Sequence, residues 1–167
     1  RARFEPLADD PILHPGRAAR ITAGTGIRGR IGELHPSLVE ELDLRAERII
    51  VAELAISGLS GGSPSVPRAV TPSRHPAVLR DLAVVVAEST PAATVADSIA
   101  SHGGRLLDDV VLFDIYRGRP LRDDQKSLAY RVTLGHPDRA LTEDEVEGII
   151  AAITTGLASD VDGHIRT

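Results

Sequence analysis

Residues 81–88 read DLAVVVAE, a run of apolar and β-branched residues that is typical of a buried strand. Downstream of it, residues 94–102 predict a helix, and the pair of glycines that follows is a common helix end. Residues 110–116 and 127–134 then predict two further strands. The order that starts at residue 81 is therefore strand, helix, strand, strand.

The end of the chain carries a second helix signal. Thr142 and Glu145 have the spacing of a capping box, in which each side chain bonds the backbone of the other residue. Apolar residues then recur on one helical face, at positions 146, 149, 150, 153 and 157. With a last strand expected within residues 161–166, the pattern predicts an α+β, ferredoxin-like fold, βαββαβ. In this fold both helices cover one face of an antiparallel sheet, and the other face is open.

The first third of the chain shows a different pattern. Residues 19–22 and 27–34 predict a strand pair across a glycine-rich turn, followed by a short helix near Pro36 and a strand at 48–56. This mostly β piece has open strand edges and few large apolar side chains. We therefore expect it to be the end of a larger domain.

A boundary is predicted where the two patterns meet. Residues 58–67, GLSGGSPSVP, consist almost entirely of Gly, Ser and Pro, the composition of a linker. We predict a first domain at 1–57, a linker at 58–72 and a second domain at 73–167.

Composition excludes several classes of function. The absence of cysteine removes disulfides, thiolate metal sites and cysteine nucleophiles. The net charge of -5 argues against a broad basic face for nucleic acids. No apolar run approaches the roughly 20 residues of a membrane-spanning helix, so we expect a cytoplasmic protein. Because the chain lacks methionine, we interpret it as a fragment of a longer protein.

Motifs for catalysis are absent or fail in their context. Gly24, Gly26 and Gly29 spell GxGxxG, but the residues that follow predict a strand instead of the helix that a dinucleotide site needs. The histidines lack the i, i+4 spacing of a helical zinc site. The aspartate pairs at 108–109 and 123–124 are interpreted as solvated turn charges, because adjacent side chains diverge. We therefore expect no catalytic residue, metal or cofactor in this chain.

Residues 112–130, LFDIYRGRPLRDDQKSLAY, hold three of the four aromatic residues. Because side chains alternate along a strand, each predicted strand presents one set of residues to each face. The set predicted to face the core is Val111, Phe113, Ile115 and, on the next strand, Tyr130. The set predicted to face the open side is Leu112, Asp114, Tyr116 and Ser127.

An exposed ring beside a carboxylate and a hydroxyl is a common arrangement for holding a base of single-stranded RNA. The Tyr116 ring would stack on the base and Asp114 would accept from its N–H groups. The connecting loop is crowded with the basic residues Arg117, Arg119, Arg122 and Lys126, and its arginines would meet phosphates. The alternative is an edge tyrosine that covers the sheet or packs on a neighbouring domain. It stays open because RNA-binding sheets usually offer two or three exposed aromatics, and this face is predicted to offer one.

Several segments together resemble a known family. Residues 73–86, 112–118, 126–134 and 136–146 (SRHPAVLRDLAVVV, LFDIYRG, KSLAYRVTL and HPDRALTEDEV) are similar, in order and spacing, to the ferredoxin-fold anticodon-binding domain of the bacterial phenylalanyl-tRNA synthetase beta subunit. The upstream segments HPGRAARI, GELHPSLVEELDL and IVAELAI resemble the end of the same subunit's catalytic-like module.

The resemblance implies a class II synthetase with two alpha and two beta subunits. The alpha subunit joins phenylalanine to tRNA with ATP and Mg²⁺, and the catalytic-like module of the beta subunit is inactive. The resemblance also implies that Asp114, Tyr116 and Ser127 contact the first anticodon base of tRNA(Phe). The connecting loop varies within the family, so Arg117 and Arg119 are added as candidate RNA contacts on their charge alone. The other hypothesis is a structural or small-molecule-binding ferredoxin-like module whose open face packs on a partner protein.

Overall fold

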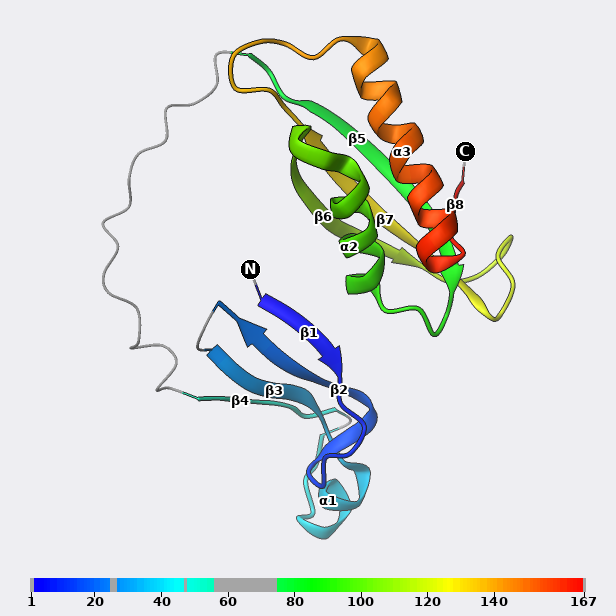
Figure 1. Ribbon diagram of the computed structural model, residues 1–167. Helices are drawn as coiled ribbons and strands as arrows, with labels where there is room; N and C mark the ends of the chain where they lie inside the picture. Colours follow the sequence, from blue (N-terminus) through cyan, green and yellow to red (C-terminus); the bar gives the residue numbers. More distant parts are fainter. Residues whose placement is uncertain (1, 25–26, 47, 56–74, 167) are drawn as a thin grey trace. The chain divides into compact units, whose positions relative to one another are not determined.

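The computed structural model describes residues 2–24, 27–46, 48–55 and 75–166 (Figure 1). The chain divides into two compact units, Arg1–Arg68 and Ala69–Thr167, which are described separately below. The linker predicted at 58–72 lies outside the described residues. Within the described ranges, no helix has both the length and the apolar character needed to cross a membrane.

The second unit has the predicted ferredoxin-like architecture. In chain order it contains β5 (Val78–Ala87), α2 (Ala92–Gly103), a 3-10 turn (Gly104–Leu106), β6 (Leu107–Tyr116), β7 (Gln125–Leu134), α3 (Glu143–Val161) and β8 (His164–Ile165). The strands form an antiparallel sheet in the order β6-β7-β5-β8. Figure 1 shows α2 and α3 side by side over one face of this sheet. The α+β fold class predicted from the sequence is confirmed.

The core of this unit lies between the two helices and the sheet. It is built from Leu82, Val84, Val86, Val95, Ile99, Val110, Leu128, Tyr130, Val132, Ile153 and Leu157. Tyr130 is only 1% exposed, and its hydroxyl donates a hydrogen bond to the Ala92 carbonyl at 2.6 Å. Burial raises the pKa of this hydroxyl, so it stays protonated as a donor. The prediction that Tyr130 belongs to the core is confirmed.

The element ends differ slightly from the prediction. Helix α2 begins two residues earlier than expected, because Pro91 occupies the N-cap position and its carbonyl accepts from the Thr94 and Val95 backbone N–H groups. Helix α3 runs to Val161 and ends at Asp162 in the left-handed conformation, which leaves only a two-residue β8.

The predicted capping box of α3 is present. The Thr142 side chain accepts from the Glu145 backbone, and a Glu145 carboxylate oxygen accepts from the Thr142 N–H at 3.0 Å. Arg139 donates to both carboxylate oxygens of Glu145, at 2.5 and 2.7 Å. The Arg139 bonds, followed by the Thr142 N–H, lower the pKa of Glu145 to about 2.

This lowered pKa makes the stability of the second unit depend on pH. A carboxyl whose pKa is lower in the folded state stabilises the fold above its unfolded pKa of about 4.3, and the contribution disappears as the pH falls to the folded value. We expect Glu145→Gln to lower the urea midpoint at pH 7, and the difference from wild type to shrink between pH 5 and pH 2. Glu143→Gln, in the same helical turn but outside the capping box, is the control. An equal loss at every pH would contradict a role for the charge.

Strand β6 departs from regular alternation at two points. Its pairing with β7 shifts next to Asp108 and again next to Phe113. Each shift places one extra residue on β6, as in a β-bulge, and so changes which face the following residues point to.

The bulges overturn part of the predicted alternation. Val110 and Leu112 pack in the core, whereas the side chains of Val111 and Phe113 are exposed. The prediction that Val111 and Phe113 face the core, and that Leu112 faces the open side, is therefore wrong. Beyond the second bulge, Ile115 pairs with the buried Leu128 of β7 and so lies on the predicted side of the sheet, but its side chain is 45% exposed and does not belong to the core.

The first unit is a four-stranded antiparallel sheet in the order β1-β2-β3-β4. Its elements are β1 (Ala2–Pro6), β2 (Leu13–Ala23), β3 (Ile27–Leu34), α1 (Pro36–Glu41) and β4 (Ile50–Leu54). The predicted strand pair, short helix and last strand are all present. Strand β1 was not predicted, although its residues alternate between apolar and charged side chains.

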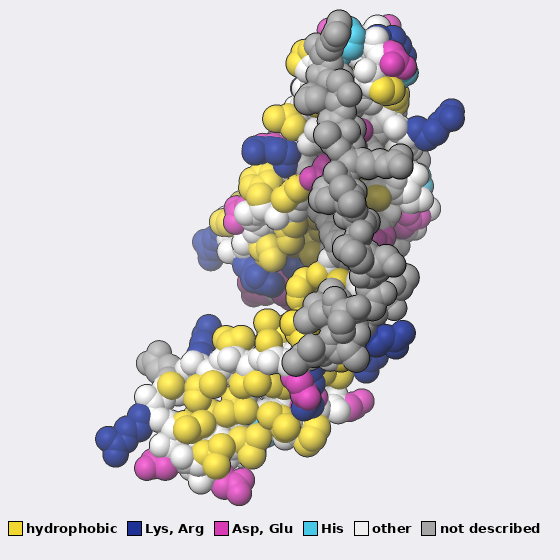
Figure 2. Space-filling view, turned by 90° about the vertical axis from the view of Figure 1, so that its left-hand side faces the viewer, with side chains coloured by type: hydrophobic (Ala, Val, Ile, Leu, Met, Phe, Trp, Pro, Cys, Tyr) yellow, Lys and Arg dark blue, Asp and Glu magenta, His cyan; other side chains and the backbone are white. Residues whose placement is uncertain are grey.

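One face of the first sheet is largely apolar. The strand register aligns Phe4, Ile21, Gly29 and Leu54 in one row across all four strands. Gly29 is required in this row, because a Cβ there would lie less than 3.0 Å from the Glu53 carbonyl oxygen. Figure 2 shows hydrophobic side chains gathered on one side of the lower body, which is the first unit. Phe4 and Leu54 remain exposed within this unit.

Candidate nucleic-acid interface

The sheet face that α2 and α3 leave uncovered carries the candidate site. Its two central strands contribute small side chains, since Ala83 of β5 pairs with Ala129 of β7 and neither belongs to the core set. The edge strand β6 contributes the rings of Phe113 and Tyr116 to the same face. Small residues beside exposed rings leave room for a flat group to lie on the sheet.

Tyr116 is held in place by the strand pairing of its backbone and by a hydrogen bond of its hydroxyl group. It is 42% exposed and pairs with Ser127 across β6 and β7. Its hydroxyl donates to the Arg119 carbonyl at 2.5 Å. The guanidinium carbon of Arg166 lies 5.9 Å from the ring centroid, a loose cation–π contact. Because Arg166 follows β8 at the opposite edge, this contact passes over the two central strands.

Ser127 and Asp114 also lie on the open face, as predicted, but in different surroundings. Asp114 pairs with Ala129 and is exposed, with one carboxylate oxygen accepting the Ile115 N–H at 2.9 Å. Ser127 is only 4% exposed, although it points away from the helices. Ser127 lies on a central strand, where it pairs with Tyr116 of β6 on one side and with Val85 of β5 on the other.

The basic residues of the connecting loop differ in whether they already bind other groups of the protein. Arg117 donates to both carboxylate oxygens of Glu88, at 2.7 and 3.0 Å, which lowers the pKa of Glu88. Lys126 is buried and donates to the Glu88 carbonyl at 2.6 Å. The Arg122 guanidinium lies 3.4 Å from Asp124.

Arg119 is the loop residue best placed to meet a phosphate. Its guanidinium makes no ion pair with the residues that the structure describes, whereas its carbonyl anchors the Tyr116 hydroxyl. Arg119 therefore fixes the Tyr116 ring through its carbonyl, and its side chain offers an available positive charge.

The sequence reasoning missed a second ring on this face. Phe113 is 52% exposed, and the Arg131 guanidinium carbon lies 5.2 Å from its centroid. Arg131 also donates to both carboxylate oxygens of Asp81, at 2.8 and 2.7 Å. This hydrogen bonding lowers the pKa of Asp81 and raises that of Arg131, so both stay charged. No sequence signal identifies the site, because the bulge that exposes Phe113 is not visible in the pattern.

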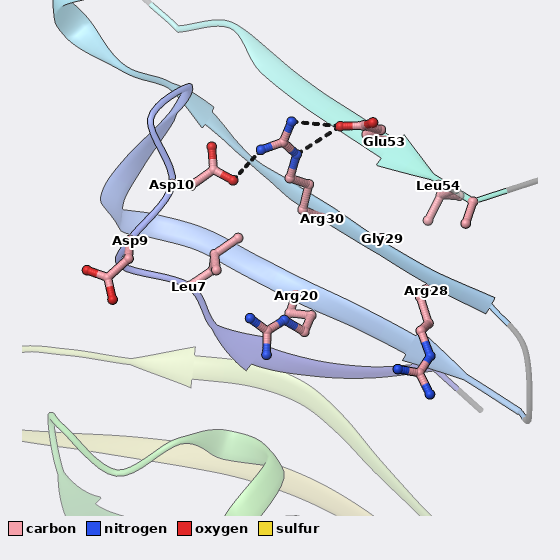
Figure 3. A pocket seen from close by; sticks show the side chains of 10 residues that line it. Leu7, Asp9, Asp10, Arg20, Arg28, Gly29, Arg30, Glu53 and Leu54 are labelled. Carbon is pink, nitrogen blue, oxygen red and sulfur yellow. Dashed lines mark hydrogen bonds and ion pairs between the residues drawn. The ribbon is translucent and has the colours of Figure 1, made fainter.

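A pocket on the polar face of the first sheet is a second place where charged side chains meet (Figure 3). At its centre Arg30 pairs with Asp10 and, at 2.7 Å, with Glu53. Backbone N–H groups at positions 12 and 13, together with Arg30, lower the pKa of Asp10. Because Arg30 pairs with both carboxylates, we interpret the pocket as a structural ion-pair network.

Metal binding finds no support in the described part of the chain. None of its clusters of His, Asp and Glu side chains has three or more members arranged to hold a metal ion.

Comparison with protein families matches two ranges of the chain. Residues 73–166 match the ferredoxin-fold anticodon binding domain, a range that contains the whole sheet and both helices of the second unit. The chain belongs to this family. Residues 1–56 match the phenylalanyl tRNA synthetase beta chain CLM domain. Both matches confirm the resemblance to the beta subunit of bacterial phenylalanyl-tRNA synthetase that the sequence motifs indicated.

Three curated relatives are each named phenylalanine–tRNA ligase beta subunit. The phenylalanine–tRNA ligase beta subunit of Moorella thermoacetica is 44% identical over 156 residues, which are 93% of this chain and 19% of the relative. That of Methylococcus capsulatus is 39% identical over 164 residues, 98% of this chain and 20% of the relative. That of Symbiobacterium thermophilum is 43% identical over 150 residues, 89% of this chain and 16% of the relative. The chain thus spans a fifth or less of the length of these relatives.

Proposed function

We propose that this chain recognises the anticodon of tRNA(Phe) as part of the beta subunit of a phenylalanine–tRNA ligase. The observation that carries the proposal is the open face of the second unit, where an exposed tyrosine ring lies beside a carboxylate over small residues. The match to an anticodon-binding family supports it. The chain itself contributes recognition and no catalytic step.

The three residues of the motif take separate roles in this proposal. Tyr116 stacks on the first anticodon base, Asp114 accepts from the N–H groups of that base, and Ser127 contacts it by its hydroxyl. Since Ser127 is only 4% exposed, the base reaches it only when the side chains around it move. Arg119 binds a phosphate of the RNA. Arg117 also binds a phosphate, after it releases the carboxylate of Glu88.

The division of the chain follows from the same proposal. Residues 73–167 form the anticodon-binding domain, 58–72 the linker, and 1–57 the end of the catalytic-like module. The apolar face of the first sheet supports the last assignment, because an exposed apolar surface of this kind needs a cover from the rest of a module.

The partners and cofactors belong to the whole enzyme. We place catalysis, ATP and Mg²⁺ in an alpha subunit, within a cytoplasmic assembly of two alpha and two beta subunits. The described residues of this chain show no ligand cluster suited to Mg²⁺. The net charge of -5 implies weak RNA binding by the chain alone, with affinity gained when other parts of the enzyme hold the same tRNA.

Base reading is tested by titrating the isotope-labelled chain with two RNAs. One is the anticodon stem-loop of tRNA(Phe), and the other differs only in the first anticodon base. We expect NMR shifts at Asp114, Tyr116 and Ser127 that are larger with the first RNA. Equal shifts with both RNAs, or none, would overturn the proposal and favour a face that packs on a partner protein.

A further inference from the structure

Phe113 and Arg131 form a second exposed stack on the open face, separate from that of Tyr116 and Arg166. We propose that this pair is a second stacking site, which takes an unpaired base neighbouring the one on Tyr116 in the same RNA strand. This inference rests on the proposed function and extends it from one base to two.

The position of Phe113 supports a binding role. A phenylalanine that is half exposed on a sheet gains little stability, because burial of apolar surface is what makes such a ring favourable. It lies at the second bulge of β6, which turns it to the open side together with Asp114. Bulges commonly redirect a side chain at a functional site.

The geometry of Arg131 leaves a flat surface for stacking. Its two bonds to Asp81 run along the edge of the guanidinium, since a bidentate pair with a carboxylate is coplanar. The guanidinium carbon lies over the Phe113 ring, 5.2 Å from its centroid, and the side chain is half exposed. RNA bases stack on arginine planes as well as on aromatic rings, so the outer face of Arg131 suits a base.

The charge of this site favours a base over a phosphate. Asp81 compensates Arg131, and the lowered pKa of Asp81 keeps it ionised at neutral pH. A phosphate would meet a neutralised pair, whereas a neutral base gains stacking without losing the ion pair. Arg119, in contrast, has no ion-pair partner among the described residues. We therefore assign Arg119 to a phosphate and Arg131 to a base.

The selectivity of this second site follows from its chemistry. Stacking accepts every base, because each base has a π-face, and it adds little salt dependence. We therefore expect the Phe113 site to strengthen binding without reading base identity, while discrimination stays at Tyr116 and Asp114.

The experiment compares dissociation constants of variants of the whole chain for the anticodon stem-loop of tRNA(Phe), by NMR titration. We expect Phe113→Ala to weaken binding at least about fivefold, with the slope of log Kd against log salt unchanged. Arg131→Lys keeps the charge beside Asp81 but removes the flat surface, and should weaken binding in the same direction. Ile115→Ala, an exposed residue of the same strand on the opposite face, is the control.

An RNA that lacks one base next to the first anticodon position gives the decisive comparison. Its loss of affinity should be large with the wild-type chain and small with Phe113→Ala, because the stacking partner is already absent. The inference is overturned if Phe113→Ala binds both RNAs like wild type while Tyr116→Ala binds weakly, and also if Arg131→Lys binds normally. If the proposed function itself is wrong, the result is different: changing the first anticodon base would then leave the affinity of every variant unchanged.

Discussion

Gly156→Ala is expected to destabilise the second unit, although alanine is the better helix former. Gly156 is buried on α3, where a Cβ would lie less than 3.0 Å from three atoms of the His102 ring on α2. Overpacking of this kind costs about 1–3 kcal/mol. The gain in helix propensity is about 1 kcal/mol, so the clash decides the sign.

The His102 ring has little freedom to move away. Its Nδ1 lies 3.0 Å from the Ser98 carbonyl and 3.6 Å from the Asp160 carboxylate. The Ser98 hydroxyl donates to the same Asp160 oxygen at 2.8 Å, which joins the two helices. A shift of the ring would break this network, and His102→Ala combined with Gly156→Ala should therefore recover part of the loss.

The chain offers a matched control and a selective signal for this prediction. Gly148 lies on the same helix, and a Cβ added there would meet no atom within 4 Å, so Gly148→Ala should raise stability by up to about 1 kcal/mol. Both tyrosines of the chain, Tyr116 and Tyr130, belong to the second unit, and there is no tryptophan. Near-UV circular dichroism in the tyrosine band therefore reports on this unit during urea unfolding, since the only aromatic residue of the first unit is Phe4, which absorbs at shorter wavelength. Effects of the same sign at both glycines would contradict the clash.

Tyr116→Ala is expected to weaken tRNA(Phe) recognition with little loss of stability. Stacking of a base on an aromatic ring contributes about 1–3 kcal/mol, or about 5- to 150-fold in affinity. The ring is half exposed and lies outside the core, so its removal costs few packing contacts. The measurements are the dissociation constant for tRNA(Phe), and kcat/KM for aminoacylation by the assembled enzyme.

Tyr116→Phe separates stacking from hydrogen bonding. It keeps the ring and removes only the bond to the Arg119 carbonyl, so binding should stay near that of wild type. If Tyr116→Phe bound as weakly as Tyr116→Ala, the hydroxyl and the loop that it anchors would be responsible instead. Normal aminoacylation by Tyr116→Ala would count against the site as a whole.

Most of the fold could be predicted because its signals are local. The β-branched run in β5, the Thr142 capping box and the apolar stripe of α3 each follow from neighbouring residues, and together they give the βαββαβ order. The assignment of Tyr130 to the core followed from regular alternation on β7, which has no bulge along its pairing with β5.

The candidate site was only partly predictable for the same reason. Asp114 and Tyr116 were placed on the correct face, although the same alternation failed for Val111 and Phe113. The two bulges of β6 depend on how this strand pairs with β7, and pairing is a property of residues far apart in the chain. The ion pair of Arg131 with Asp81 joins two strands that are separated by a helix and another strand.

By itself, the sequence determined the order of the elements, the family, and the residues Asp114, Tyr116 and Ser127 as candidates. Only the tertiary structure decided that Phe113 faces outward, that Ser127 is covered, and which arginines already have partners. The physical reason is that periodicity and capping act within a few residues, whereas burial and charge pairing depend on contacts between distant strands.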